Sequence, residues 1–190
     1  VMMAGPGLRG EQVVIGPGGV DTAGGWLSDE LIAQNRNAQE RIFAIIKEEK
    51  DPGVAETRIR QEAEVFREIA ARIRAEASES RRYEANRVAG AIEGQTSLFL
   101  SRWFRFYFSY DPRTSLIKVK CPVLAVNGER DTQVPARENL EAIREALESG
   151  GNKDYTVLML PNLNHLLQNA ETGAISEYEQ IEETISVLAL

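Results

Sequence analysis

Cysteine and histidine are almost absent from this sequence, whose 190 residues include one of each, Cys121 and His165. A single cysteine excludes an intrachain disulfide framework and a multi-cysteine metal site. A single histidine excludes a metal site built from several imidazoles. The sequence also has no run of about 18 apolar residues, so it predicts no transmembrane helix. Because Cys121 precedes a proline at the start of a predicted strand, we expect its thiol to be buried and inert.

Basic residues are in the minority as well. The chain has 22 Lys and Arg against 29 Asp and Glu, which gives a net charge of −7 at pH 7. Phosphate binding needs a basic face, so we expect no nucleic-acid partner. The hydrophobic content of 43% and the charged content of 27% are typical of a globular protein and not of a disordered one.

The first part of the chain is rich in glycine. Val1–Ala4 predicts the end of a buried strand, and residues 5–25 hold eight of the 15 glycines, a density typical of turns. Residues 5–10 match the Gly-x-Gly-x-x-Gly pattern of dinucleotide sites, which requires a helix to begin at the loop. Residues 11–18, Glu-Gln-Val-Val-Ile-Gly-Pro-Gly, do not read as a helix, so no nucleotide site is expected.

Long helices are predicted over the next 80 residues. The first runs from an N-cap at Ser28 to about residue 50, and Asp51-Pro52-Gly53 ends it and caps a second helix over 54–77. A third, weaker helix covers 80–92 and is interrupted at Gly94. Apolar residues recur at helical spacing, and the Arg and Glu residues between them predict a solvated surface.

Residues 98–110 contain seven of the chain's 13 aromatic residues. One interpretation is a buried helix packed on all sides. The other is that some of the rings line an apolar substrate cleft, for which we select Trp103, Phe104 and Tyr107. The two interpretations are compatible, since one face of a helix can serve each purpose.

From residue 111 the pattern changes to alternating strands and helices. An apolar strand is predicted over 121–127, a helix over 136–147 and a second strand over 155–160. Asp131 follows the first of these strands and His165 follows the second. Parallel strands would bring both side chains to the same edge of the sheet, where the carboxylate could fix the imidazole tautomer and leave the other nitrogen as a general base. The alternative is a surface aspartate and a loop histidine that never meet.

Residues 118–170 resemble the C-terminal part of an α/β-hydrolase, and most closely the bacterial serine aminopeptidase and acyl-esterase type. The resemblance rests on Cys-Pro-Val-Leu-Ala-Val-Asn-Gly-Glu-Arg-Asp at 121–131 and on Leu-Pro-Asn-Leu-Asn-His at 160–165. It implies that Asp131 is the acid and His165 the base of a catalytic triad, in the order usual for that fold. The aromatic run at 103–112 resembles the end of the family's helical cap, and Val1–Gly7 resembles the strand after its nucleophile helix.

The family's nucleophile motif, Gly-x-Ser-x-Gly, occurs nowhere in the sequence. We therefore expect the C-terminal portion of a serine hydrolase, with a partial α/β-hydrolase sheet and a helical cap. Its parts would be residues 1–26 and 111–190 as core and 27–110 as cap. The implied reaction is hydrolysis of a carboxylic ester through an acyl-serine. Without the serine, the chain alone should be inactive.

Several alternatives remain open at this point. The substrate could be a peptide, or the chain could be a non-catalytic fragment or interaction module that pairs through an exposed sheet edge. A separate chain with the nucleophile half, or a second copy, would be the partner at that edge. No metal or organic cofactor is implied.

Glu129 and Glu177 are weaker candidates for the acid than Asp131. Asn162 and Asn164 are expected to shape the loop that carries His165.

Overall fold

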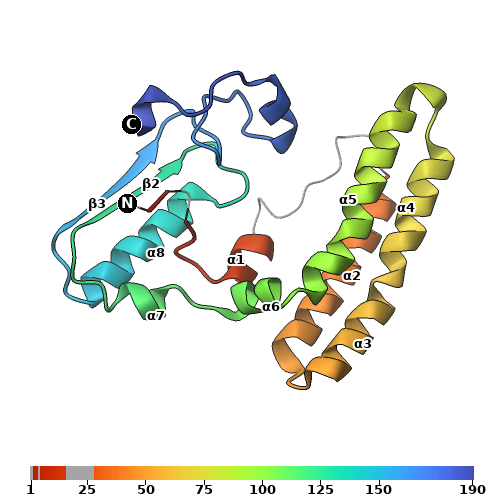
Figure 1. Ribbon diagram of the computed structural model, residues 1–190, viewed down its shortest axis with the longest axis horizontal. Coiled ribbons are helices and arrows are strands. Elements are labelled where there is room, and N and C mark those ends of the chain that lie inside the picture. Colours follow the sequence, from red (N-terminus) through yellow and green to blue (C-terminus); the bar gives the residue numbers. More distant parts are fainter. Residues whose placement is uncertain (1, 4, 16–27) are drawn as a thin grey trace. The chain divides into compact units, whose positions relative to one another are not determined.

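The computed structural model describes residues 2, 3, 5–15 and 28–190 (Figure 1). The chain divides into two compact units. Val1–Val20 and Phe108–Leu190 make up the core unit, and Asp21–Tyr107 make up the helical unit. Val1 and Ala4 of the predicted first strand, residues 16–25 of the predicted glycine-rich stretch and the two residues after it lie outside the described residues.

The core unit contains a parallel sheet of three strands in the order β1-β2-β3. β1 (Met2–Met3) pairs with β2 (Val123–Gly128), and β2 pairs with β3 (Tyr155–Leu160). Val123 lies opposite Tyr155 and Gly128 opposite Leu160, so β2 and β3 end together. The two strands predicted at 121–127 and 155–160 are confirmed, and their parallel pairing brings the loops that follow them to one edge.

Helix α8 (Ala136–Ser149) connects β2 to β3 and covers one face of the sheet. Its inner residues Leu140, Ile143 and Leu147 pack with Ala125 of β2 and Leu116 of the short helix α7 (Arg113–Leu116). The opposite face is only partly covered, because Val126 packs with Leu163 and Leu167 while Leu124 and Leu158 stay 36% and 44% exposed. The apolar run at 121–127 predicts a strand buried on both faces, and the described residues bury one face more completely than the other.

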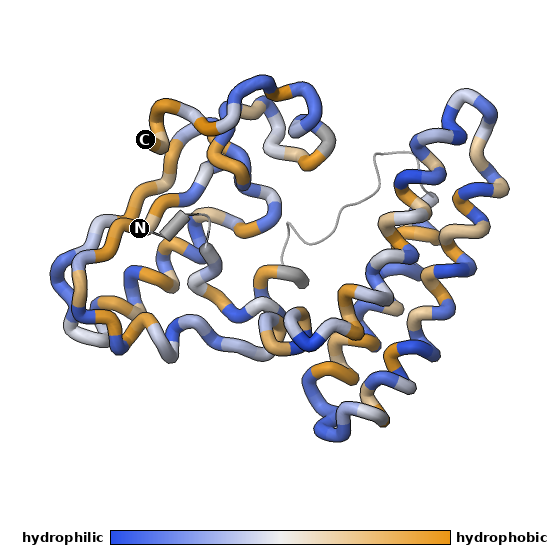
Figure 2. Tube along the Cα trace, viewed as in Figure 1, coloured by the Kyte–Doolittle hydropathy of each residue, from blue (hydrophilic) through white to orange (hydrophobic). Residues whose placement is uncertain are grey.

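Helices α2 (Asp29–Glu48), α3 (Pro52–Glu62), α4 (Glu64–Glu76) and α5 (Arg82–Leu100) make up most of the helical unit. The predicted caps are confirmed: Ser28 Oγ accepts from Leu31 N, and Asp51 Oδ1 accepts from Gly53 N and Val54 N. Figure 2 shows apolar positions recurring along these helices. Their largest fully buried side chains form the core of the unit: Leu31, Ile42, Ile59, Phe66, Ile69, Ile73 and Ile92.

Three helix boundaries differ from the sequence prediction. The helix expected over 54–77 is two helices that meet at Ala63. α5 continues through Gly94, where a sequence reading predicted an interruption. The aromatic segment is divided at Ser101, whose backbone is extended and whose Oγ accepts from Phe104 N at the start of α6 (Arg102–Ser109). The weak helix preference of glycine was overridden by packing at Gly94, and a local side-chain cap at Ser101, which the sequence analysis did not single out, divides the aromatic segment.

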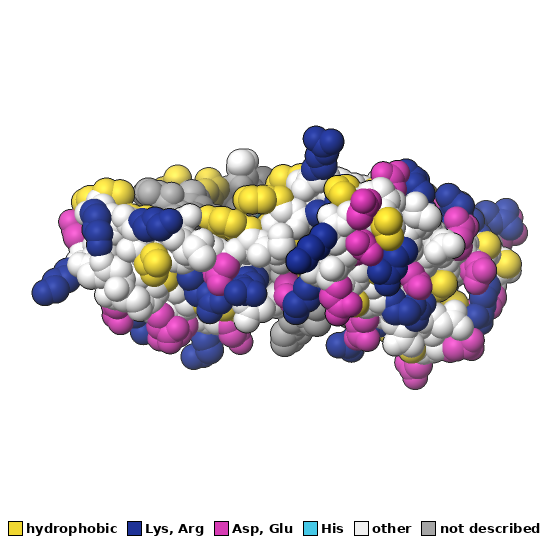
Figure 3. All heavy atoms as spheres, turned by 90° about the horizontal axis from the view of Figure 1, so that it is seen from below, with side chains coloured by type: hydrophobic (Ala, Val, Ile, Leu, Met, Phe, Trp, Pro, Cys, Tyr) yellow, Lys and Arg dark blue, Asp and Glu magenta, His cyan; other side chains and the backbone are white. Residues whose placement is uncertain are grey.

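Charged side chains cover the outer surface of the helices, as the Arg and Glu pattern predicts. Ion pairs join Arg60 to Glu56 and Arg74 to Glu93, all with exposed side chains. Figure 3 shows basic and acidic side chains intermixed over the visible face. Among the described residues, no helix combines the length and the apolar character needed to cross a bilayer.

The remaining elements are short. Helix α1 (Gly10–Ile15) begins at the last glycine of the Gly-x-Gly-x-x-Gly motif, so the expectation of no helix over 11–18 was wrong for residues 11–15, while residues 16–18 lie outside the described residues. Nearby, Asp111 accepts hydrogen bonds from Arg9 and Arg113, which hold the pKa of its carboxyl well below the usual range. The described residues also form the 3₁₀ helices η1 (Glu79–Arg81), η2 (Ile175–Gln180) and η3 (Val187–Ala189).

Replacing Gly94 by alanine should stabilise the helical unit. A Cβ at this position would meet nothing within 4 Å, and the residue lies inside α5. Alanine is favoured over glycine in a helix interior by about 1 kcal/mol. We expect the midpoint of urea denaturation to rise at unchanged slope. A lower urea midpoint for Gly94→Ala than for the unsubstituted chain would mean that the fold requires glycine at position 94.

Candidate active site

Gly128, the last residue of β2, allows the loops after β2 and β3 to touch. A Cβ on Gly128 would lie 2.2 Å from the backbone oxygen of Leu163 and 2.6 Å from that of Asn164. The two loops are also joined by main-chain hydrogen bonds, from Glu129 N to Leu160 O at 2.8 Å and from Arg130 N to Leu163 O at 2.9 Å. The turn after β2, residues 129–135, is called the acid turn below, and residues 161–170 are called the histidine loop.

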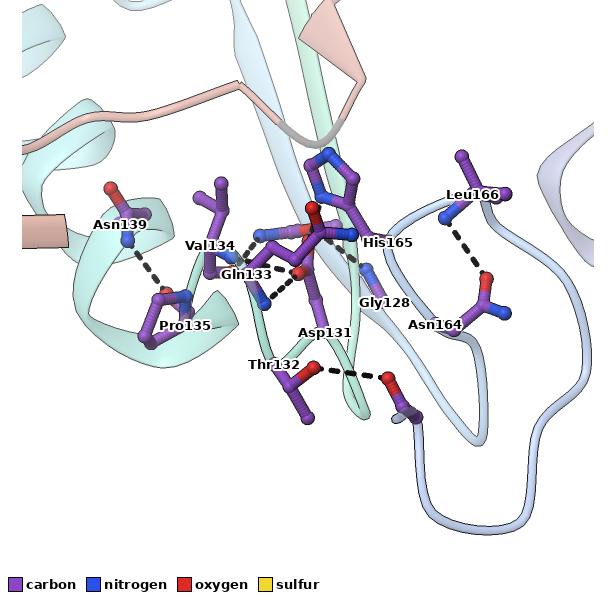
Figure 4. A network of polar contacts seen from close by, with 12 residues as sticks. Gly128, Asp131, Thr132, Gln133, Val134, Pro135, Asn139, Asn164, His165 and Leu166 are labelled. Atoms are coloured by element: carbon purple, nitrogen blue, oxygen red, sulfur yellow. Dashed lines mark hydrogen bonds and ion pairs between the residues drawn. The ribbon is translucent and has the colours of Figure 1, made fainter. Parts of the chain in front are cut away.

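Asp131 has a completely buried side chain in the acid turn. Its Oδ1 accepts from Gln133 N at 2.9 Å and from Val134 N at 2.8 Å, while its Oδ2 lies 2.8 Å from Nδ1 of His165 (Figure 4). A buried carboxylate is costly unless hydrogen bonds satisfy it. Both oxygens of Asp131 are satisfied, one by the turn and the other by the imidazole.

His165 therefore lies against Asp131, and the sequence prediction that these two residues meet is confirmed by their geometry. The carboxylate accepts, so Nδ1 carries the proton of the neutral ring and Nε2 is the nitrogen able to accept a proton. The imidazole is 28% exposed, which leaves it accessible to a reacting group. The arrangement has the hydrogen-bonding geometry that a general base and its orienting acid require.

The histidine loop is shaped by asparagines, as expected. Asn164 is fully buried, and its Oδ1 accepts from Leu166 N at 2.9 Å and from Gln168 N at 3.0 Å. Asn162 and Leu167 have positive φ angles of 60° and 59°. The side chain of Asn164 therefore fixes the conformation of the loop around His165, and its hydrogen bonds give no indication of a ligand-binding role.

Asn127 is a residue of this site that the sequence analysis did not single out. It is 1% exposed, its Nδ2 donates to Val134 O at 2.9 Å and its Oδ1 accepts from Gly128 N at 3.0 Å. It thereby holds the end of the acid turn to β2. The sequence did contain a signal for Asn127, since an asparagine at the end of an apolar strand must find polar partners when it is buried.

The loop at residues 5–10 has no free amides to offer a phosphate at its centre. Gly7 N and Leu8 N both donate to Oδ1 of Asn139 in α8, at 2.9 and 3.1 Å. A Cβ on Gly7 would lie 2.2 Å from the backbone oxygen of Asn139. These glycines let the loop pack closely on α8, so the expectation of no nucleotide site remains, although α1 is helical.

The aromatic residues of the predicted substrate cleft belong to the helical unit. The rings of Trp103 and Tyr107 stack at 5.3 Å with an angle of 4° between their planes, and Trp103 is 63% exposed. Phe104 is instead 3% exposed and packs against Phe43 and Phe99. The prediction of a helix buried on all sides is thus wrong for Trp103. Phe104 is part of the hydrophobic core of the helical unit. Substrate binding by these rings stays a prediction.

The other single candidates have structural explanations. Cys121 is exposed, contrary to expectation, because it lies ahead of the first residue of β2. Glu129 accepts from Asn162 N at 3.1 Å, and Glu177 accepts from Thr172 N and Gly173 N, so neither replaces Asp131 beside the imidazole. In the part of the chain that the structure describes, no group of three or more His, Cys, Asp and Glu residues could hold a metal ion.

Residues 93–184 match the model of the prolyl oligopeptidase family, whose members have the α/β-hydrolase fold. The match contains both Asp131 and His165 and supports an α/β-hydrolase-type domain of the serine peptidase or hydrolase kind. The parallel sheet with its crossover helix is consistent with part of such a domain. Comparisons with curated proteins and with solved structures gave no match.

Proposed function

We propose that this chain supplies the acid and the base of a serine hydrolase that cleaves carboxylic esters through an acyl-serine. The observation that carries the proposal is the 2.8 Å hydrogen bond between Nδ1 of His165 and Oδ2 of Asp131 at the carboxyl ends of adjacent parallel strands. The resemblance of residues 118–170 to α/β-hydrolases and the family match over 93–184 support the same reaction class.

His165 is the proton carrier in this mechanism. As the serine Oγ forms a bond to the substrate carbonyl carbon, its proton passes to Nε2 of His165. The imidazolium then gives this proton to the alcohol oxygen as the bond from the carbonyl carbon to that oxygen breaks. In the second half of the reaction, a water molecule gives a proton to Nε2 as its oxygen bonds to the acyl carbon. The imidazolium then returns this proton to the serine Oγ as the acyl-serine bond breaks. Asp131 holds the ring in the required tautomer and stabilises the imidazolium, while the amides of Gln133 and Val134 keep the carboxylate in place.

The serine comes from sequence other than these 190 residues, because no Gly-x-Ser-x-Gly is present. The serine-bearing sequence would also provide the oxyanion-hole amide that follows the nucleophile. We call the combination of this chain with that sequence, on one polypeptide or two, the complete enzyme.

Peptide hydrolysis is the second candidate, and the match to the prolyl oligopeptidase family favours it. Both reactions use the same acid and base, so the dyad does not separate them. The comparison of a p-nitrophenyl ester with the p-nitroanilide of the same acyl group does. If the enzyme is an esterase, its kcat/KM for the ester should exceed its kcat/KM for the anilide by much more than the difference in intrinsic reactivity of the two bonds explains.

The chain by itself should not turn over p-nitrophenyl acetate above the rate of its His165→Ala variant. Loss of the triad nucleophile lowers kcat by about 10⁶-fold in a serine protease. A fluorophosphonate probe should likewise leave the chain unlabelled and label the complete enzyme. Inhibitor-sensitive turnover by the chain alone would contradict the proposal that the nucleophilic serine lies outside these 190 residues. A complete enzyme inactive on both esters and amides would contradict the proposed function and favour an interaction module.

A further inference from the structure

The segment that follows the histidine loop is fastened to the acid turn. The guanidinium of Arg130 donates to Ala170 O, and Thr132 Oγ1 donates to Gly173 O at 3.0 Å. Gly173 has a φ of +79°, and a Cβ there would overlap the backbone oxygen of Arg130. Residues 170–173 therefore approach the acid turn as closely as the backbone permits.

Glu177 stabilises the bend that redirects the chain after this contact. Its carboxylate accepts from Thr172 N and Gly173 N, each at 2.8 Å. Burial acts to raise the pKa of Glu177, but hydrogen bonds from Thr172 and Gly173 outweigh it and lower the pKa. The carboxylate is thus held in its charged form, and η2, which begins at Ile175, starts from a fixed place.

Tyr178 is the residue of η2 that reaches the acid turn. Its phenol oxygen accepts from Gln133 Nε2 at 2.8 Å. Burial raises the pKa of Tyr178, and the negative charge of Asp131 raises it further. The phenol is therefore neutral at physiological pH and does not repel Asp131.

These contacts join Tyr178 to the dyad through Gln133. Gln133 binds Asp131 through its main-chain N–H and Tyr178 through its side-chain amide. Asp131 in turn holds the imidazole of His165. The hydrogen bond from Gln133 to η2 therefore adds to the main-chain bonds that already join the acid turn to the histidine loop.

We propose that Tyr178 is a positioning residue that, through its hydrogen bond with the side chain of Gln133, keeps the acid turn and Asp131 in register with His165. The inference rests on the proposed function for its catalytic meaning, although the geometry itself can be tested without catalysis. Tyr178 is not assigned a contact with substrate. Its removal should loosen the dyad and lower kcat, and leave KM unchanged.

The test uses the single histidine of the chain. Because His165 is the only imidazole, nitrogen NMR of the purified chain reports its tautomer and the exchange of its Nδ1 proton without assignment. In the unsubstituted chain one tautomer, protonated at Nδ1, should dominate. In Tyr178→Phe, loss of the hydrogen bond to Gln133 of the acid turn should speed Nδ1 proton exchange by about three- to tenfold and introduce the second tautomer.

Two further variants make the test specific. Gln133→Leu keeps the main-chain amide that Asp131 needs and removes only the bond to Tyr178, so it should reproduce the effect of Tyr178→Phe. Tyr83→Phe removes a phenol that is on an 84% exposed residue and should change nothing. Unaltered exchange and tautomer in both Tyr178→Phe and Gln133→Leu would overturn the proposal.

Kinetics of the complete enzyme separate this proposal from the proposed function. Tyr178→Phe should lower kcat about three- to tenfold at unchanged KM, in proportion to the loosening seen by NMR. If Tyr178→Phe leaves kcat unchanged while Asp131→Asn abolishes it, the positioning role fails and the hydrolase remains. If the NMR effects occur but the complete enzyme hydrolyses neither esters nor amides, the hydrolase fails and Tyr178 has a structural role only.

Discussion

Replacing His165 by alanine should lower kcat/KM of the complete enzyme for an ester by about 10⁶-fold, and Asp131→Asn should lower it by about 10⁴-fold. The alanine variant has no group to accept the serine proton. The asparagine variant retains the imidazole but loses the carboxylate that selects its tautomer. Steady-state hydrolysis of p-nitrophenyl acetate measures both effects.

The order of the two effects follows from the geometry of Asp131. Its Oδ1 faces two backbone amides, from Gln133 and Val134. An asparagine that keeps its carbonyl oxygen there must turn its NH₂ toward Nδ1 of His165. The NH₂ donates, so Nδ1 becomes an acceptor and the ring proton moves to Nε2, where a base must be unprotonated. The ring remains in place in the wrong tautomer.

Asp154→Asn is the matched control for this substitution. Asp154 is exposed and lies just before β3, at the opposite end of the strand from the histidine loop. Its replacement makes the same change of charge and should leave kcat/KM within about twofold, since surface substitutions rarely matter. Activity of Asp131→Asn within tenfold of the unsubstituted enzyme would remove Asp131 from the mechanism.

Replacing Gly128 by alanine should damage both stability and the dyad. The added Cβ would overlap the backbone oxygens of Leu163 and Asn164, at 2.2 and 2.6 Å. Neither oxygen can withdraw without moving the histidine loop, and withdrawal would break the hydrogen bond from Arg130 N to Leu163 O. We expect a loss of about 3 kcal/mol or more, or about 10 °C in Tm for a chain of this length.

The loss at Gly128 should be accompanied by a change at His165. If the histidine loop moves, Nδ1 of His165 leaves Oδ2 of Asp131, and its proton signal should broaden or disappear in NMR spectra. Gly94→Ala is the matched control, because it adds the same methyl group where nothing lies within 4 Å. A chain with Gly128→Ala that keeps its Tm and its Nδ1 proton would show that the two loops do not depend on this close approach.

The two strands and the helix between residues 121 and 160 could be predicted from the sequence because each has a strong local pattern. Val123–Gly128 and Tyr155–Leu160 are short apolar runs bounded by turn residues, and Leu140, Ile143 and Leu147 follow helical spacing. The caps at Ser28 and Asp51 were predictable for the same reason, since a cap depends on the two or three residues that follow it.

Two of the errors concern residues whose surroundings are decided by distant parts of the chain. Gly94 lies within a continuous helix because α5 packs along α4. Phe104 is buried by Phe43 and Phe99, whereas its neighbour Trp103 remains exposed. A run of aromatic residues indicates burial of some rings without indicating which.

The sequence by itself determined β2, α8 and β3, because apolar spacing and turn residues act over a few positions, and its resemblance to α/β-hydrolases pointed to Asp131 and His165. Only the tertiary structure decided how the dyad is held. The partners of the bonds from His165 to Asp131 and from Gln133 to Tyr178 are 34 and 45 residues apart. Such bonds form only where packing has already brought the loops together, as the bare backbone of Gly128 allows, and no local pattern encodes that approach.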